Sequence, residues 1–280
     1  MTSAARCGFI FVTGVLVVAC SSEHELDVSP GEADDDEAAA GKADGSSSQK
    51  AELKVVIDSA QIRRARSRLS LLNADSETRR IWFYDTPSLD LYEAGVILRA
   101  REIDGDVDDS TIKLRPFEMS QLETRFRSLD DLKCEIDRDP DSESTACSLK
   151  SDVGEEHIAD VGAYLRQVRG LFSAEQEDLL AEHGPGLTPT DCERLGPIPA
   201  RVWTIETDAL PKKLTAELWY MPDGGQVLEL SMKVDAADAD DGMDALLDFV
   251  DGRGLDLDAV QGSKTKRALD ALAGVPVQQY

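Results

Sequence analysis

The stretch from Trp82 to Pro116 constrains the fold of this chain most, because it carries basic side chains at the spacing of β-strands. Arg99 and Arg101 are two residues apart, and so are Lys113 and Arg115. Residues two apart on a strand point to the same side, so each pair directs two charges to one face. The opposite face of the first strand is apolar, with Val96, Leu98 and Ala100. The stretch therefore predicts a β-hairpin with one cationic face.

The charge of the whole chain gives this cationic face more weight. The 280 residues have a formal net charge of −25 and a pI near 4.4. An acidic surface repels phosphate backbones and anionic membranes, which argues against bulk nucleic-acid binding. A local concentration of arginine and lysine is therefore not explained by composition, whereas the 41% hydrophobic content is ample for a core.

The N-terminal residues have the pattern of an export signal. Met1–Ala19 combines Arg6 with an apolar run from Gly8 to Ala19, which is too short for an ordinary membrane-spanning helix. The run ends at Cys20 in a segment that resembles the lipobox of bacterial lipoproteins, in which the cysteine is lipidated. Because Ser21 follows, the resemblance implies an outer-membrane lipoprotein facing the periplasm or the cell surface. The alternative is a plain signal peptide that leaves a soluble secreted protein.

A disordered tether is expected after Cys20, over residues 20–49. This segment has no apolar period and is rich in acidic and small residues. Acidic runs also bind calcium, but 34–37 lacks the glycine and the spaced ligands of a calcium loop. We therefore expect a signal peptide at 1–19, the tether at 20–49, a folded domain at 50–273 and a tail at 274–280.

Three cysteines remain once Cys7 is removed with the signal and Cys20 is lipidated. An exported compartment is oxidising, so a disulfide is expected. Cys134 with Cys147 would close a short loop and is the preferred pair, which leaves Cys192 as a free thiol. Their surroundings lack the spacing of a zinc site or of a nucleophile.

The first part of the folded segment predicts a strand, a helix, a strand and then the hairpin. Alternation predicts a strand over 50–57, and Ser59 is expected to cap a helix that runs to about Leu72. A second strand is expected over 81–85 and a helical turn over 89–94. The hairpin turn contains Asp104, Gly105 and Asp106, which tolerate turn conformations. Antiparallel hairpins argue against a doubly wound parallel sheet.

The segment Tyr84-Asp85-Thr86-Pro87, followed by Gly95, the Leu98–Arg101 run and the Lys113–Arg115 run, resembles the CYTH domain. That superfamily includes inorganic and thiamine triphosphatases and class IV adenylate cyclases. The resemblance implies an α+β fold with an eight-stranded antiparallel β-barrel, a triphosphate tunnel with basic lumen residues, and divalent metal held by carboxylates. It extends over about Glu52 to Ala271.

One segment, about 117–199, matches the family poorly, and we expect it to be a helical insertion or helices packed outside the barrel. Within it, 134–137 is a candidate barrel strand, and 155–171 and 173–183 have helical spacing. A further helix is expected over 241–251.

The ends of the resemblance are the least complete. The family opens with a Glu-x-Glu-x-Lys strand, where this chain has Lys50, Glu52 and Lys54. Three late strands match Arg201–Ile205, 214–221 and 227–234, and the closing Ser-Lys pair matches 263–264. In the last strand Glu229 is followed by Ser231 and Lys233, where the family has acidic residues.

The resemblance implies two sets of site residues. Guanidinium and ammonium groups suit a polyphosphate, and arginine binds two phosphate oxygens at once. The phosphate-binding candidates are Lys54, Arg99, Arg101, Lys113, Arg115, Arg201 and Lys264. Mg²⁺ or Mn²⁺ would polarise the phosphoryl group and position a water, with Glu52, Glu217 and Glu229 as metal ligands. The alternative for Glu229 is a cross-strand ion pair with a lumen arginine.

Two functions of different classes follow. The first is metal-dependent hydrolysis of triphosphate or short polyphosphate, and the second is binding of such a polyanion without turnover. Cyclase activity is less compatible with an exported protein, which has no ready supply of ATP. The alternative for the basic residues is an exposed face of an ordinary sheet, but crowded cations repel one another when no anion is bound.

Overall fold

The computed structural model describes residues 49–154, 157–162 and 168–274. The expected signal peptide, the lipidation site at Cys20 and nearly all of the tether lie outside the described residues, as does the end of the tail. In the described part, no helix is long and apolar enough to cross a membrane.

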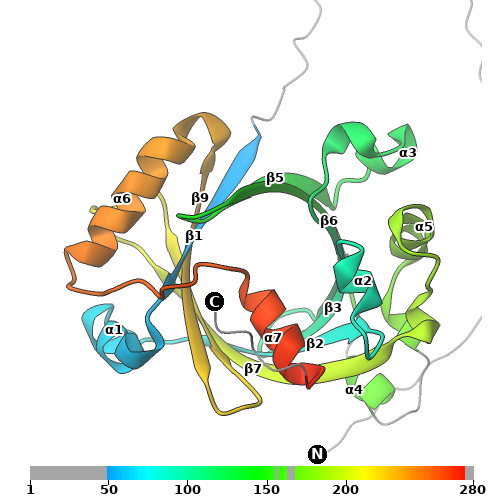
Figure 1. Ribbon diagram of the computed structural model, residues 1–280, viewed down its shortest axis with the longest axis horizontal. Helices are drawn as coiled ribbons and strands as arrows, with labels where there is room; N and C mark the ends of the chain where they lie inside the picture. Colours follow the sequence, from blue (N-terminus) through cyan, green and yellow to red (C-terminus); the bar gives the residue numbers. More distant parts are fainter. Residues whose placement is uncertain (1–48, 155–156, 163–167, 275–280) are drawn as a thin grey trace, which may run out of the picture. The chain divides into compact units, whose positions relative to one another are not determined.

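The described chain forms a closed β-barrel with helices packed around it (Figure 1). Around the barrel the strand order is β1-β5-β6-β4-β3-β2-β7-β8-β9. The strand bounds are β1 (Lys50–Ile57), β2 (Glu77–Asp85), β3 (Val96–Ile103), β4 (Asp109–Leu114), β5 (Leu132–Arg138), β6 (Glu143–Asp152), β7 (Glu193–Ile205), β8 (Leu214–Tyr220) and β9 (Gln226–Asp235). The α+β barrel that the sequence predicts is therefore confirmed.

The barrel differs from the prediction in strand number and in one strand pair. The described residues contain nine barrel strands rather than eight. β1 and β5 are parallel, with Lys50 beside Glu135 and Leu53 beside Arg138, whereas the other neighbouring pairs are antiparallel. The segment 117–199 is the reason, since it supplies β5, β6 and the first half of β7 in addition to helices.

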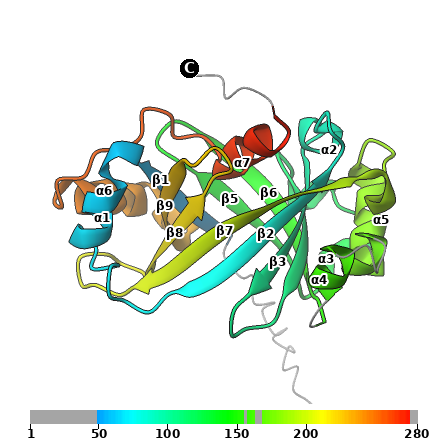
Figure 2. The same ribbon diagram turned by 90° about the horizontal axis from the view of Figure 1, so that it is seen from below.

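The helices lie on two sides of the barrel and at one of its mouths (Figures 1 and 2). α1 and α6 are on one side, and α3, α4 and α5 are on the other. The α-helices are α1 (Ile62–Arg68), α2 (Asp90–Glu93), α3 (Thr124–Arg127), α4 (His157–Gly162), α5 (Ala174–His183), α6 (Ala239–Asp251) and α7 (Lys264–Leu272). Single 3₁₀ turns occur at Ser59–Gln61, Met119–Gln121, Val168–Leu171, Pro189–Asp191 and Ala236–Asp238.

The helix expected from Ser59 to Leu72 ends earlier, at Arg68. Ser70 has a φ of 59°, and the N–H of Leu71 donates to the carbonyl of Arg66. A left-handed residue followed by such a bond is a Schellman cap, which ends a helix. Leu71 is thereby turned back into the core, whereas Leu72, the expected end of the helix, is exposed.

The hairpin and its cationic face are as predicted, and the structure adds the register of the two strands. Arg99 of β3 lies beside Thr111 of β4, and Arg101 lies beside Asp109. Gly95, before β3, has a φ of 80°, and a Cβ at this position would lie 2.5 Å from the carbonyl oxygen of Arg115. Glycine is therefore required where the two strands converge.

The Tyr84–Pro87 motif shapes the turn into β3. The carboxylate of Asp85 accepts hydrogen bonds from the backbone N–H groups of Thr86, Leu91 and Tyr92, at 2.7 to 2.9 Å. Asp85 is buried, and these bonds fix α2 against the end of β2. The motif thus contributes to the fold, and it places the arginines of β3 without touching the lumen.

A disulfide joins Cys134 of β5 to Cys147 of β6, which are direct register partners. Cys192 is a buried free thiol, and burial raises its pKa to about 12. A thiol with so high a pKa is protonated at neutral pH and is a poor nucleophile.

Candidate functional site in the barrel lumen

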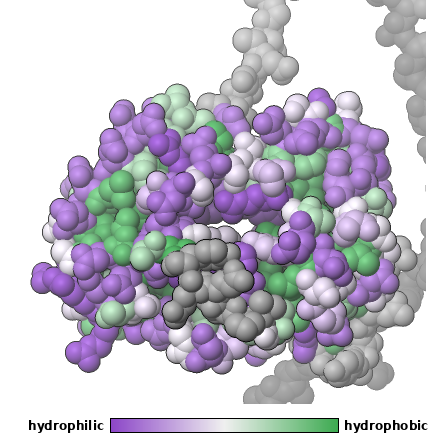
Figure 3. All heavy atoms as spheres, viewed as in Figure 1, coloured by the Kyte–Doolittle hydropathy of each residue, from purple (hydrophilic) through white to green (hydrophobic). Residues whose placement is uncertain are grey.

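The inward faces of the strands enclose a cavity of about 400 Å³. Figure 3 shows a hollow at the centre of this face of the molecule, bordered by hydrophilic side chains. Eleven basic residues line the cavity: Lys54, Arg79, Arg99, Arg101, Lys113, Arg115, Lys133, Arg138, Lys150, Lys233 and Lys264. Seven acidic residues line it: Glu52, Asp131, Glu135, Asp137, Asp139, Glu217 and Glu229. When all are ionised, the lining has four more positive than negative charges, in a chain of net charge −25.

α7 covers part of one mouth of the barrel (Figure 1). Its Ala268 and Leu269 join a buried cluster with Val56, Phe83 and Trp219 of β1, β2 and β8. This apolar packing anchors the helix and places Lys264, its first residue, over the lumen.

Six of the seven predicted phosphate-binding residues line the cavity, and Arg201 does not. On β7 it is Val202 that lies beside the lumen residue Glu217, whereas Arg201 lies beside Leu218 on the opposite face. There Arg201 donates to Ser76 Oγ at 3.0 Å. Side chains alternate along a strand, so a shift of one residue turns a side chain from the lumen to the outer face. β2 contributes Arg79 to the lumen, a residue that is not among the predicted phosphate-binding residues.

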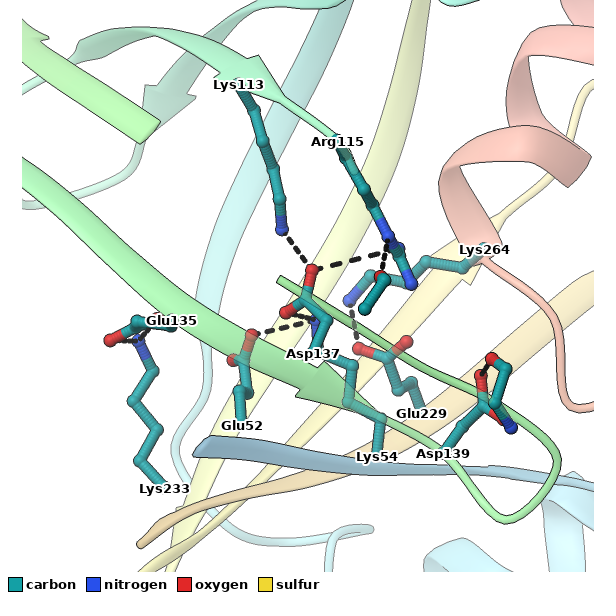
Figure 4. Close-up of polar contacts among 12 residues, drawn as sticks. Glu52, Lys54, Lys113, Arg115, Glu135, Asp137, Asp139, Glu229, Lys233 and Lys264 are labelled. Carbon is teal, nitrogen blue, oxygen red and sulfur yellow. Dashed lines mark hydrogen bonds and ion pairs between the residues drawn. The ribbon is translucent and has the colours of Figure 1, made fainter. Parts of the chain in front are cut away.

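Asp137 of β5 gathers three of the predicted phosphate-binding cations (Figure 4). Its carboxylate lies 2.9 Å from Lys54 Nζ, 2.5 Å from Lys113 Nζ and 3.7 Å from Arg115 Nη1. Burial alone would raise the pKa of Asp137, but the two ammonium groups outweigh it and hold the pKa well below its usual range. Asp137 was missed because its strand matches the family poorly. The alternation of Lys133, Glu135 and Asp137 with apolar neighbours was the available signal.

A second charged cluster joins β8, β9 and α7. Lys264 Nζ lies 2.8 Å from Glu229 Oε1 and also contacts the carboxylate of Glu217. Burial would raise the pKa of Glu217, but Lys264 and the indole N–H of Trp219 lower it to about 2. The same carboxylates raise the pKa of Lys264 against its burial. Glu217 and Lys264 are therefore both charged at neutral pH.

Arg99 of β3 is the lumen arginine that has no carboxylate partner among the described residues. Its one hydrogen bond is a long one, 3.5 Å from Nη2 to Thr111 Oγ1, and its buried Nε has no acceptor. Burial and the charge of Arg101 lower the pKa of Arg99 from 12.5 to about 9. By contrast, Arg101 makes two hydrogen bonds to buried Asp109. A partly buried guanidinium whose buried N–H has no acceptor is costly unless an anion binds.

The three predicted metal ligands do not come together. Glu217 and Glu229 are register partners, but Glu52 lies beside Lys233, four residues along β9 from Glu229. Four strand residues span roughly 13 Å, too far for one ion to join these carboxylates. Glu52 binds Lys54 at 2.8 Å instead. Residues 49–154, 157–162 and 168–274 contain no group of three or more acidic, histidine or cysteine residues placed to hold a metal. In this arrangement the residues do not fit Mg²⁺ or Mn²⁺.

The fold is shared with two solved structures. A candidate adenylate cyclase from Bacillus halodurans superposes with a TM-score of 0.56 at 12% identity, over 79% of this chain and 97% of that chain. A candidate adenylyl cyclase from Hippeastrum, described as having a dominant triphosphatase activity, superposes with a TM-score of 0.55 at 15% identity, over 78% of this chain and 94% of that chain. No family model matches the sequence, and no curated protein matches it. The chain therefore has the fold of these CYTH-type proteins.

Proposed function

We propose that the barrel lumen binds a small polyanion of the triphosphate or polyphosphate type. Arg99 carries this proposal, because its guanidinium faces the cavity, its buried Nε has no acceptor, and it forms no ion pair with a carboxylate. Phosphate oxygens would supply the missing acceptors, and a guanidinium fork bonds two of them at once.

The rest of the lumen supports a ligand with several negative charges. The lining has an excess of basic residues, and Lys54, Lys113 and Arg115 converge on a single carboxylate. A polyphosphate would interact with these groups together, as well as with Arg99. The volume of about 400 Å³ is at the small end for ligand pockets, which favours a compact anion.

Binding without metal-dependent turnover is the function that the site supports best. Metal-dependent hydrolysis needs free carboxylates to bind the cation that activates a water. Glu217 and Glu229 are not free, because both bind Lys264. The triphosphatase activity described for the Hippeastrum protein belongs to a chain only 15% identical to this one. The binding function is therefore proposed for this chain, and turnover is an outcome to be tested.

The test uses the full-length protein and tripolyphosphate. In buffer with EDTA, tripolyphosphate should raise the melting temperature in a saturable manner, because a ligand that binds only the folded state stabilises it. With Mg²⁺ or Mn²⁺ added, no release of inorganic phosphate is expected. If tripolyphosphate changes nothing in EDTA, the lumen is not an anion site. Metal-dependent phosphate release would instead favour the triphosphatase.

We also propose that the protein is exported and attached to the outer membrane through a lipid on Cys20. The signal-like residues 1–19 and the lipobox-like end support this placement. The full chain expressed in a Gram-negative bacterium should incorporate radiolabelled palmitate, and the Cys20→Ser variant should not. Label in neither protein would support the soluble secreted alternative.

A further inference from the structure

Lys264 occupies the position between Glu217 and Glu229 at which a divalent cation would have to sit. The two glutamates are direct partners on neighbouring strands, so their Cβ atoms are about 5 Å apart and their carboxylates converge. Lys264 Nζ contacts both of them, and these side chains are largely buried. Mg²⁺ is commonly held by one or two carboxylates together with ligand phosphates. The pair therefore has the donors for a metal, but an ammonium group already uses them.

We infer that Lys264 is a built-in replacement for the divalent cation, so that the lumen binds its polyanion without metal and removal of the Lys264 side chain creates a divalent-cation site. The two carboxylates carry two negative charges, and one ammonium group balances one of them. Without Lys264, two buried like charges would face each other, and a divalent cation would neutralise both. Occupation of the pair by Lys264 does not depend on any ligand, whereas metal-independent anion binding rests on the function proposed above.

The position of Lys264 on α7 makes the replacement permanent in the folded protein. Ala268, one turn further along the helix, is fully buried, and Leu269 packs in the same cluster. Lys264 also lies 4.9 Å from the ring centroid of Trp219, which gives the ammonium group a further attractive contact. The anchored helix and the cation–π contact together restrict the movement of the ammonium group and hold it between the two carboxylates.

Mn²⁺ binding by electron paramagnetic resonance tests the inference with the full-length protein and no anion. The wild type should bind no Mn²⁺ in the lumen at millimolar concentration, whereas Lys264→Ala should bind one ion in that concentration range. The control is Lys266→Ala, which removes one positive charge from the exposed side of the same helix. Because it changes the net charge equally, it should bind Mn²⁺ like the wild type. Adding Glu217→Gln to Lys264→Ala should abolish the new site.

Two further measurements keep the inference testable if Lys264→Ala does not fold. Lys264→Gln retains a hydrogen-bond donor for one carboxylate and should also gain Mn²⁺ binding. In the wild type, Mn²⁺ should not strengthen tripolyphosphate binding above its value in EDTA. Wild-type Mn²⁺ binding that depends on Glu217, or a tenfold gain in anion affinity with Mn²⁺, would overturn the replacement. Failure of tripolyphosphate to bind under any condition would instead refute the proposed function and leave the Mn²⁺ result on Lys264→Ala unaffected.

Discussion

Arg99→Met should stabilise the ligand-free protein and at the same time remove most of its affinity for tripolyphosphate. Methionine keeps the apolar stem of the side chain and removes a partly buried charge that forms no ion pair with a carboxylate. It also removes the repulsion from Arg101, one of the causes that lower the pKa of Arg99 to about 9. Most buried substitutions destabilise a protein, so a gain in stability would be diagnostic.

The size of the gain follows from the pKa shift. Each unit is worth about 1.4 kcal/mol, so the fall from 12.5 to about 9 sets an upper limit of about 5 kcal/mol. Water and protein dipoles reduce this cost, and we expect a gain of about 1–3 kcal/mol. For a domain of this size, each kcal/mol shifts the melting temperature by about 2–4 °C. Loss of charged hydrogen bonds to phosphate, worth about 1.5–3 kcal/mol, should weaken binding roughly 10- to 100-fold.

The assay is thermal unfolding of both proteins in EDTA, with and without tripolyphosphate. Without ligand, the wild type should have the lower melting temperature. At saturating tripolyphosphate, the difference between the two melting temperatures should become smaller or change sign. A variant that is less stable than the wild type without ligand would show that Arg99 has a stabilising partner, and the reasoning from its burial would be refuted.

Three further predictions concern charge pairs and the disulfide. Glu217 has a pKa of about 2 against an ordinary 4.5, so its contribution of about 3 kcal/mol is complete above pH 4.5 and is lost as the pH falls towards 2. Between pH 6 and 2.5, the free energy of unfolding should therefore fall more steeply with pH for the wild type than for Glu217→Gln. Equal slopes would show that the pKa of Glu217 is not lowered by folding. Asp137→Asn should destabilise the ligand-free protein by about 3–5 kcal/mol, because buried cations lose their partner, while calorimetry shows tighter tripolyphosphate binding. Unchanged affinity would mean that this carboxylate does not compete with the ligand. The Cys134→Ala/Cys147→Ala variant should lose about 3 kcal/mol of unfolding free energy in urea, because the bond joins residues 13 apart in the sequence, and an unchanged midpoint would contradict this.

The sequence could predict those parts of the lumen that depend on spacing within one segment. Arg99, Arg101, Lys113 and Arg115 face inward because a strand repeats every two residues, and that repeat is visible without the structure. Once the hairpin is part of a closed barrel, its cationic face lies in the lumen. The same local reasoning placed the strands on either side of the hairpin.

Residues whose position depends on register between strands were less accessible. Arg201 faces outward because of its pairing with Leu218, and a strand with mixed polarity on both faces does not reveal that pairing. The role of Asp137 depends on the neighbourhood of β1, β4 and β5, which are far apart in the sequence. β1 and β5 pair in parallel over only four register pairs, and so short a contact leaves no pattern in the sequence that would predict it.

The partner of each charge was the least predictable feature of the site. Lys264 and Glu217 are 47 residues apart, and the sequence pattern assigns one to a phosphate and the other to a metal rather than to each other. A pattern of acidic and basic residues in a lumen is compatible with bound metal, bound phosphate or internal ion pairs. Only the distances show which carboxylates are already used, and they leave Arg99 without one.

Isothermal titration calorimetry of the full-length protein with tripolyphosphate in EDTA tests the central claim most directly. We predict saturable binding of one tripolyphosphate per chain, weakened at least tenfold by Arg99→Met and unchanged by Arg201→Met, since Arg201 lies on the outer face of the barrel. Absence of binding, or equal affinity of the Arg99→Met variant and the wild type, would contradict the assignment of the lumen as a polyanion site.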